Sequence, residues 1–290
     1  MELSPHITLI IKVTNACDMK CRYCFIEPSV FHKTMKDSTA RRVVRAFLDS
    51  EFFESVQFVW HGGEPLLRGR RFFEQVFDEQ RSRSTAVAYT NSTQTNATHL
   101  DDEMLDFLLA NDVSIGLSLD GPAPLTNASR RPRRLIPVSD ESSGCGNRVD
   151  AHATTVDAAR RLQERGQQAG AIVTVNRNNV FEPEAVYEEF RARRIHMKVN
   201  PLTRSGLADT PVGADLGITA EEYGEFLVRL FDAWYDDPTP TISIEPFAQH
   251  VSRILGIEVA HSCFYTLSCH RFFLGISPDG NLFPCGMFQG

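Results

Sequence analysis

The sequence predicts an α/β protein built as a partial TIM-like barrel of six β/α units, with a short C-terminal β-hairpin extension that carries cysteines. Short β-branched runs alternate with longer amphipathic stretches along most of the 290 residues, which is typical of parallel strands joined by helices. The alternation yields too few units for a closed eight-fold barrel. Polar and cysteine-containing motifs directly follow several of the strands, where functional groups of parallel α/β folds gather.

The predicted strands are short and rich in apolar or β-branched residues. They span residues 7–13, 56–60, 89–95, 113–119, 171–175 and 195–200. The predicted helices span residues 39–48, 72–79, 101–110, 155–165, 183–193, 220–235 and 246–255, with Ser38 as N-cap of the first. Right-handed crossovers between sequential strands place all the carboxyl ends at one rim of the sheet.

The composition of the chain excludes several classes of function. The chain is 42% apolar and 23% charged, as in an ordinary globular protein. The formal net charge of −7 argues against a general nucleic-acid binder, whose surface would be basic. We expect no membrane span and no secretory signal, because no long apolar stretch and no basic start are present. A cytoplasmic protein is the expectation.

The seven cysteines are clustered rather than spread as a disulfide framework. Cys17, Cys21 and Cys24 form a C-x3-C-x2-C loop, a soft-ligand set that suits iron or zinc. A structural zinc needs a fourth ligand, and a redox pair at Cys21 and Cys24 would leave Cys17 unexplained. Three thiolates suit a [4Fe–4S] cluster with one open iron position. Cys145, in a turn-rich segment, is expected to be a loop thiol without function.

Further motifs follow the other strands. His61-Gly62-Gly63-Glu64-Pro65 ends the second strand, and Ser118-Leu-Asp-Gly-Pro122 ends the fourth. Glycine lacks a Cβ, so Gly62 and Gly63 permit a close approach of another group to the backbone. Because these motifs share the rim with the cysteine loop, we expect them to complete one site.

Together, these segments resemble the radical S-adenosylmethionine (SAM) superfamily, in its peptide-modifying branch. CDMKCRYC followed by Phe25, WHGGEP at 60–65, QTN at 94–96, SLDGP at 118–122 and TVNRNN at 174–179 carry the resemblance. It implies a [4Fe–4S] cluster on Cys17, Cys21 and Cys24, with SAM chelating its open iron. It also implies SAM-binding roles for a wider set of residues: Tyr23, Gly62, Gly63, Glu64, Pro65, Asn96, Ser118, Arg130 and Leu202.

Plainer interpretations of several of these side chains stay open. Tyr23 and Leu202 also fit as core residues, Glu64 as a locally paired carboxylate and Ser118 as a strand-end hydroxyl. Arg130 belongs to the basic run RRPRR, in which Arg131, Arg133 and Arg134 compete for its role, and which also fits a solvated loop.

The resemblance implies a reaction and its partners. The reduced cluster cleaves SAM to a 5′-deoxyadenosyl radical, which abstracts hydrogen from a peptide or protein. An electron donor such as flavodoxin or ferredoxin is implied. We expect a ribosomally made peptide as substrate; the alternatives are an anaerobic sulfatase-maturing enzyme and a non-catalytic iron–sulfur or zinc protein. Two positions argue against a sulfatase-maturing enzyme. Sulfatase-maturing enzymes carry a catalytic Asp where this chain has Gly286, and they tend to carry Gln where it has His61. No catalytic residue is assigned.

A second cysteine group, Cys263, Cys269 and Cys285, surrounds a predicted β-hairpin with a turn at residues 278–281. It is similar to the beginning of the SPASM domain, which binds auxiliary [4Fe–4S] clusters. Three cysteines allow one such cluster but not two, so we expect a truncated or reduced version. The expected division is a core over 1–215, a helical linker over 216–260 and this cysteine region over 261–290.

Overall fold

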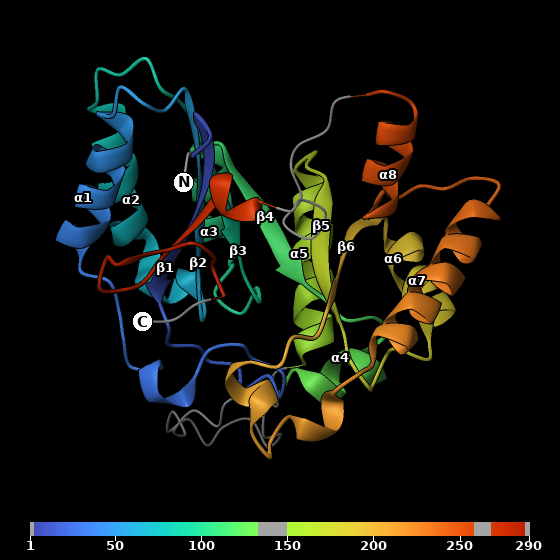
Figure 1. Ribbon diagram of the computed structural model, residues 1–290. Coiled ribbons are helices and arrows are strands. Elements are labelled where there is room, and N and C mark those ends of the chain that lie inside the picture. Colours follow the sequence, from blue (N-terminus) through green and yellow to red (C-terminus); the bar gives the residue numbers. More distant parts are fainter. Residues whose placement is uncertain (1–2, 133–149, 258–267, 288–290) are drawn as a thin grey trace.

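The described strands form one open, mostly parallel sheet. The computed structural model describes residues 3–132, 150–257 and 268–287. Within them the strand order is β7-β6-β5-β4-β3-β2-β1-β8-β9, and only the β8–β9 pair is antiparallel. The consecutive parallel order from β1 to β6 confirms the predicted α/β partial barrel. The parallel strands β1 to β6 run toward the lower edge of Figure 1, so their carboxyl ends share that rim.

The elements have the following bounds. The strands are β1 (His6–Thr14), β2 (Ser55–Gly62), β3 (Ala88–Gln94), β4 (Val113–Ser118), β5 (Ala169–Val175), β6 (Ile195–Pro201), β7 (Ile244–Glu245), β8 (Phe273–Ile276) and β9 (Leu282–Phe283). The α-helices are α1 (Asp37–Leu48), α2 (Gly69–Arg81), α3 (Asp102–Ala110), α4 (Ala123–Ser129), α5 (Ala151–Glu164), α6 (Pro183–Arg193), α7 (Ala220–Tyr235) and α8 (Phe247–Ile254). The short 3-10 helices are η1 (Pro28–Val30), η2 (Pro65–Arg68), η3 (Gly206–Asp209), η4 (Ala214–Leu216) and η6 (Cys269–Arg271).

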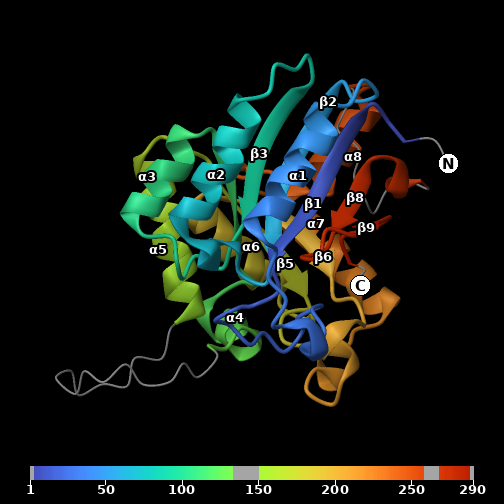
Figure 2. The same ribbon diagram turned by 90° about the vertical axis from the view of Figure 1, so that its left-hand side faces the viewer.

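The hydrophobic core lies between the sheet and the helices that cover its outer face. Figure 2 shows α1 and α2 in front of the first strands. Alternate residues of β1, Ile7, Leu9 and Ile11, are buried in the same cluster as the apolar face of those helices. Because side chains alternate along a strand, Thr8, Ile10 and Lys12 point to the opposite, concave face. The concave face is therefore available to build a site.

Two local differences from the sequence expectations concern polar residues. Ser38 does not cap α1, because the helix begins at Asp37 with Lys36 as its N-cap. An acidic residue in the first turn suits the positive end of the helix dipole, which explains the earlier start. A helix that was not predicted, α4, follows β4 in a stretch of small and polar residues.

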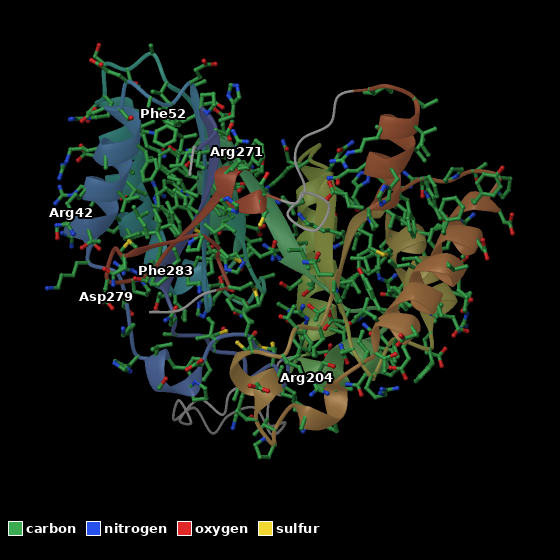
Figure 3. All side chains as sticks on the ribbon, in the orientation of Figure 1. Arg42, Phe52, Arg204, Arg271, Asp279 and Phe283 are labelled. Atoms are coloured by element: carbon green, nitrogen blue, oxygen red, sulfur yellow. The ribbon has the colours of Figure 1, made fainter. Side chains whose placement is uncertain are left out.

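The C-terminal hairpin is present, and it extends the barrel sheet itself. β8 pairs in parallel with β1, from Thr8 opposite Phe273 to Ile11 opposite Ile276. The hairpin turn is held by an ion pair between Lys33 Nζ and Asp279 Oδ2 at 2.8 Å. Figure 3 shows Asp279 on the side of the hairpin that faces α1. The hairpin is thereby fixed beside the first strand.

Residues 216–257 also join the core. Phe226 and Leu230 of α7 are buried in the main hydrophobic cluster, and β7 pairs with β6. The proposed division of the chain at residues 215 and 260 stays a prediction. None of the described helices has the length and apolar character needed to cross a membrane.

If α7 is part of the core, Phe226→Ala lowers the free energy of unfolding by about 3–5 kcal/mol, because it leaves a cavity in a packed interior. The matched control is Val228→Ala on the same helix, since Val228 is 60% exposed whereas Phe226 is 1% exposed. Urea unfolding followed by circular dichroism measures both. Equal, small effects of the two substitutions would contradict the assignment of α7 to the core.

Candidate functional site

The cysteine loop follows β1 and lies at the carboxyl rim, where segments after other strands clamp it. The amide of Lys20 donates to the carbonyl of Arg131 at 2.6 Å, and the amide of Arg22 donates to Ser129 at 3.0 Å. On the other side, the amide of Leu207 donates to the carbonyl of Cys24 at 2.8 Å. The segments after β4 and β6 therefore fix the loop through its backbone.

The two glycines after β2 bring that strand end against the start of the loop. The amide of Gly63 donates to Thr14 O at 2.7 Å, and that of Glu64 donates to Ala16 O at 2.9 Å. A Cβ would lie 2.0 Å from Thr14 O at Gly62 and 2.2 Å from Ala16 O at Gly63. Gly62 also has φ +135°, which favours glycine. The glycines are thus needed for contact between two protein segments.

Glu64 connects the second strand to the third. Its carboxylate is fully buried and accepts from the amide of Leu66 (3.0 Å), Thr95 Oγ1 (2.7 Å) and the amide of Asn96 (2.8 Å). Burial raises its pKa to about 7, against the effect of these hydrogen bonds. The predicted residue Pro65 opens η2 directly after it and is also buried.

Asn96 reaches back to the cysteine loop. Its Nδ2 donates to Asp18 Oδ1 at 2.9 Å and lies 3.7 Å from Cys17 Sγ, while its Oδ1 accepts from the amide of Thr98 at 3.0 Å. Its side chain therefore orients the loop beside the first cysteine.

Asp120, two residues beyond β4, is the centre of a buried polar network. It is 0% exposed, and its carboxylate accepts from Arg130 Nε at 2.9 Å, from Arg130 Nη2 at 3.2 Å and from the amide of Thr174 at 3.0 Å. The hydroxyl of Tyr23 also donates to it. The Arg130 guanidinium lies 5.4 Å from the centre of the Tyr23 ring. One carboxylate thus joins the cysteine loop to the ends of β4 and β5.

Arg130 is buried and is not part of a solvated loop, which was the alternative that the sequence left open. Arg130 is 8% exposed. Burial alone would lower the pKa of its guanidinium, but Asp120, Tyr23 and Cys21 hold that pKa above its ordinary value. Arg130 therefore stays charged, close to the cysteine loop. Arg131 is described but takes part through its carbonyl, whereas Arg133 and Arg134 lie outside the described residues.

The three thiols of the loop fit an iron–sulfur cluster. Burial raises the pKa of Cys17, and it raises that of Cys21 to about 12, with neighbouring thiolates adding to the shift. Bound iron would reverse this, since a metal deprotonates a coordinating thiol outright. In the described chain, no three His, Cys, Asp or Glu side chains converge as around a single metal ion. Cysteines that surround a cluster bind different iron atoms, so such convergence is not required.

The remaining residues predicted for the site make single hydrogen bonds or lie outside the described part of the chain. Ser118 lies on the concave face at the end of β4, and its Oγ accepts from Gln94 Nε2 at 3.1 Å. Leu202 follows β6, and its amide donates to Val175 O at 2.9 Å. Cys269 and Cys285 are free thiols of intermediate exposure. Cys263 and Cys145 lie outside the described residues.

Sequence reasoning missed Asp120, Gln94 and Lys12 as members of this rim. Asp120 stands inside the SLDGP motif, but no local pattern shows that its partners are Tyr23 and Arg130. Gln94 ends β3, and Gly116 leaves room for it, since a Cβ at Gly116 would lie 2.4 Å from Gln94 Oε1. A buried lysine within an apolar strand, as at Lys12, was a signal that could have been used.

Comparison with known proteins decides the family. The model of the radical SAM superfamily matches residues 11–190. The chain belongs to the radical SAM superfamily. Enzymes of this superfamily use a [4Fe–4S] cluster and SAM, which confirms these two predicted cofactors for this radical SAM enzyme.

Several curated relatives are anaerobic sulfatase-maturating enzymes. The chain is 26% identical to the cysteine-type enzyme of Clostridium perfringens, over 98% of this chain and 75% of the relative. It is 24% identical to the serine-type enzyme of Bacteroides thetaiotaomicron, over 98% and 70%. This radical SAM enzyme is therefore related to sulfatase-maturating enzymes.

Solved structures show the same fold. Native anSMEcpe with bound AdoMet and Cp18Cys peptide has a TM-score of 0.80 at 26% identity, covering 98% of this chain and 75% of that chain. SuiB of Streptococcus suis, bound to the precursor peptide SuiA, has a TM-score of 0.62 at 15% identity, covering 99% and 61%. The second likeness bears on the fold alone.

The contact between strand 2 and the cysteine loop makes Gly63 intolerant of a side chain. We expect Gly63→Ala to lower the iron content after anaerobic reconstitution, because the new methyl meets backbone atoms that cannot move independently. The control is Gly224→Ala on α7, where a Cβ would meet nothing within 4 Å. Iron and sulfide assays compare them. Full iron loading of Gly63→Ala would refute the constraint.

Loss of charge at position 120 leaves a buried guanidinium unpaired. Asp120→Asn is expected to lower the free energy of unfolding by about 3–5 kcal/mol and to weaken SAM binding, measured by equilibrium dialysis of the iron-loaded protein. Asp106→Asn, which removes an exposed partner of Arg165, serves as the control. Unchanged stability and SAM affinity in Asp120→Asn would show that the network is dispensable.

Proposed function

We propose that this radical SAM enzyme abstracts a hydrogen atom from a peptide or protein substrate at the concave face beside the cysteine loop. The observation that carries the proposal is the junction at Asp120, which ties Tyr23 of the cysteine loop to Arg130 and to the end of β5. Such a junction presents three thiols, a buried cation and the strand-end polar groups at one rim.

Each predicted residue then has a role. Cys17, Cys21 and Cys24 hold the [4Fe–4S] cluster through their thiolates. When bound, the cluster and SAM supply a 5′-deoxyadenosyl radical that removes hydrogen from the substrate. The cofactor is held by further residues of the rim: Tyr23, Gly62, Gly63, Glu64, Pro65, Asn96, Ser118, Arg130 and Leu202. Arg130, whose Nε and Nη2 are taken by Asp120, supplies a further guanidinium N–H donor for the SAM carboxylate, and Ser118 supplies a hydroxyl for its ribose.

Two substrate classes fit. The sulfatase-maturating relatives and the peptide bound to anSMEcpe support a protein or peptide whose cysteine or serine is oxidised. Position 286 favours a different peptide maturation. A Cβ at Gly286 would lie 2.8 Å from Ile10 Cδ1, so a catalytic Asp there requires Ile10 to move.

The remaining partners belong to the same proposal. Cys269 and Cys285, together with Cys263, hold an auxiliary cluster in a SPASM-like region. A flavodoxin or ferredoxin in the cytoplasm supplies the electron. No nucleic acid takes part, in line with the net charge of −7.

Anaerobically reconstituted protein, reduced with dithionite, is expected to convert SAM to 5′-deoxyadenosine, measured by chromatography. The Cys17→Ala/Cys21→Ala/Cys24→Ala variant loses this reaction because its cluster has no ligands, whereas Cys269→Ala/Cys285→Ala retains it. Bound iron without any SAM cleavage in the wild type would support the non-catalytic alternative.

The substrate class is tested with the Cp18Cys peptide and a copy in which serine replaces its cysteine. Mass spectrometry that shows oxidation of either peptide supports a sulfatase-type reaction. SAM cleavage with both peptides unchanged would direct the search to ribosomally made peptides.

A further inference from the structure

A charged pair lies beside the first cysteine of the loop, outside the residues assigned to the cofactors. Asp18 directly follows Cys17, and its Oδ2 lies 3.5 Å from Nε2 of His99. The side chain of Asp18 is 10% exposed and that of His99 is 41% exposed, so the pair joins the buried loop to the surface. A partly buried pair of this kind is screened by salt much less than a pair of exposed groups.

The turn after β3 places His99 at the loop. Asn96 Oδ1 accepts from the amide of Thr98 at 3.0 Å, and the amide of Leu100 donates to Ala97 O at 3.1 Å. Ala97 has φ +67°, a conformation that residues other than glycine rarely adopt, and its side chain is buried. Leu100 is buried in the hydrophobic core. The backbone that carries His99 is therefore anchored on both sides of it.

The second oxygen of the Asp18 carboxylate faces the first cysteine. Asp18 Oδ1 accepts from Asn96 Nδ2 at 2.9 Å and lies 3.9 Å from Cys17 Sγ. The two oxygens thus have different neighbours, the imidazole at Oδ2 and the sulfur at Oδ1. At this distance, any negative charge of the carboxylate that is left uncompensated acts directly on the cysteine.

The cysteines of the loop differ in the charges around them. The guanidinium of Arg130 acts on Cys21, whereas the groups that act on Cys17 include the carboxyl groups of Glu64 and Asp18. Cys17 therefore lies on the more negative side of the loop. His99 brings a cation to this side, where it pairs with one of the two acids.

The surroundings of His99 favour its charged form. The hydrogen bond with Asp18 raises the pKa of the imidazole, and the charges of Glu64 and Asp101 add to the shift, against the effect of partial burial. These three carboxyl groups come from the cysteine loop, the end of β2 and the start of α3. An imidazolium among them offsets negative charge next to the first cysteine.

Charge next to a cluster ligand has a defined consequence. Reduction adds one negative charge to an iron–sulfur cluster, so the reduction potential depends on nearby charges and on hydrogen bonds to the sulfurs. A carboxylate without a partner beside a ligand sulfur disfavours reduction and lowers the potential. A cation that is paired with this carboxylate cancels much of the effect.

We propose that His99 is a positioning residue for the radical-generating cluster: it holds the Asp18 carboxylate and offsets its charge beside Cys17, which raises the reduction potential of the cluster. This inference rests on the proposed function, in which Cys17 is a ligand of the [4Fe–4S] cluster. It adds a residue outside the cysteine loop that controls how readily the cluster accepts its electron.

The test is a redox titration of the reconstituted protein, followed by electron paramagnetic resonance. It uses the Cys269→Ala/Cys285→Ala background, in which only the loop cluster is expected. His99→Leu removes donor and charge, His99→Gln retains a donor, and His99→Lys retains a charge. We expect His99→Leu and His99→Gln to lower the equilibrium constant for one-electron reduction about tenfold, which corresponds to about 59 mV, and His99→Lys to restore most of it.

A double-mutant cycle shows whether His99 acts through Asp18. Asp18→Asn is expected to raise the potential, because it removes a negative charge beside Cys17, and His99→Leu should then change it little. The matched control is His6→Leu, since His6 pairs with Glu54 at 3.6 Å at the amino end of β1, away from the loop. This substitution should leave the potential unchanged.

Three results would overturn the inference and leave the proposed function intact. The first is an equal potential with and without His99→Leu. The second is a wild-type potential in His99→Gln, since a hydrogen bond alone would then suffice. The third is an equal effect of His99→Leu in the presence and absence of Asp18→Asn. If His99→Leu binds no iron, the comparison of His99→Gln with His99→Lys decides.

Failure of the proposed function gives a different result. A wild type that holds a cluster but does not cleave SAM would contradict the proposed function, and the potentials would still test the role of His99. A wild type that binds no cluster at all would overturn both.

Discussion

The buried ion pair between Asp120 and Arg130 is the interaction on which the rim depends. Neither group is stable alone in an environment without water, and losing one partner of such a pair costs more than the pair itself contributes. Asp120 also accepts from Tyr23 and from the amide of Thr174, so its four donors come from three different segments. The cysteine loop therefore occupies its place only when the ends of β4 and β5 are correctly arranged.

The sequence predicted the order of the six barrel strands because apolar runs and polar strand ends alternate regularly. It also predicted the residues that come together at the rim, since strand-end motifs of a parallel sheet share one edge. The parallel pairing of β8 with β1 was not predictable, because more than 250 residues separate these strands and no local pattern records their contact. Asp120 was missed for the same reason, since Arg130 resembles any residue of a basic loop until its burial is known.

Polar networks on both sides of the cysteine loop hold the rim together. Glu64 and Asn96 belong to one polar network, which reaches the cysteine loop at Asp18, and Asp120 and Arg130 belong to another, which reaches it at Tyr23. Buried networks of this kind rigidify the segments that they join, which here are the cysteine loop and the strand ends around it.

Electron paramagnetic resonance of the reduced protein tests the central claim most directly, that Cys17, Cys21 and Cys24 hold a cluster with an iron site open to SAM. In the Cys269→Ala/Cys285→Ala background only this cluster is expected. Its reduced signal should change in shape when SAM is added, because SAM then binds the open iron. A cluster signal that SAM leaves unaltered, although SAM binds the protein, would contradict the account.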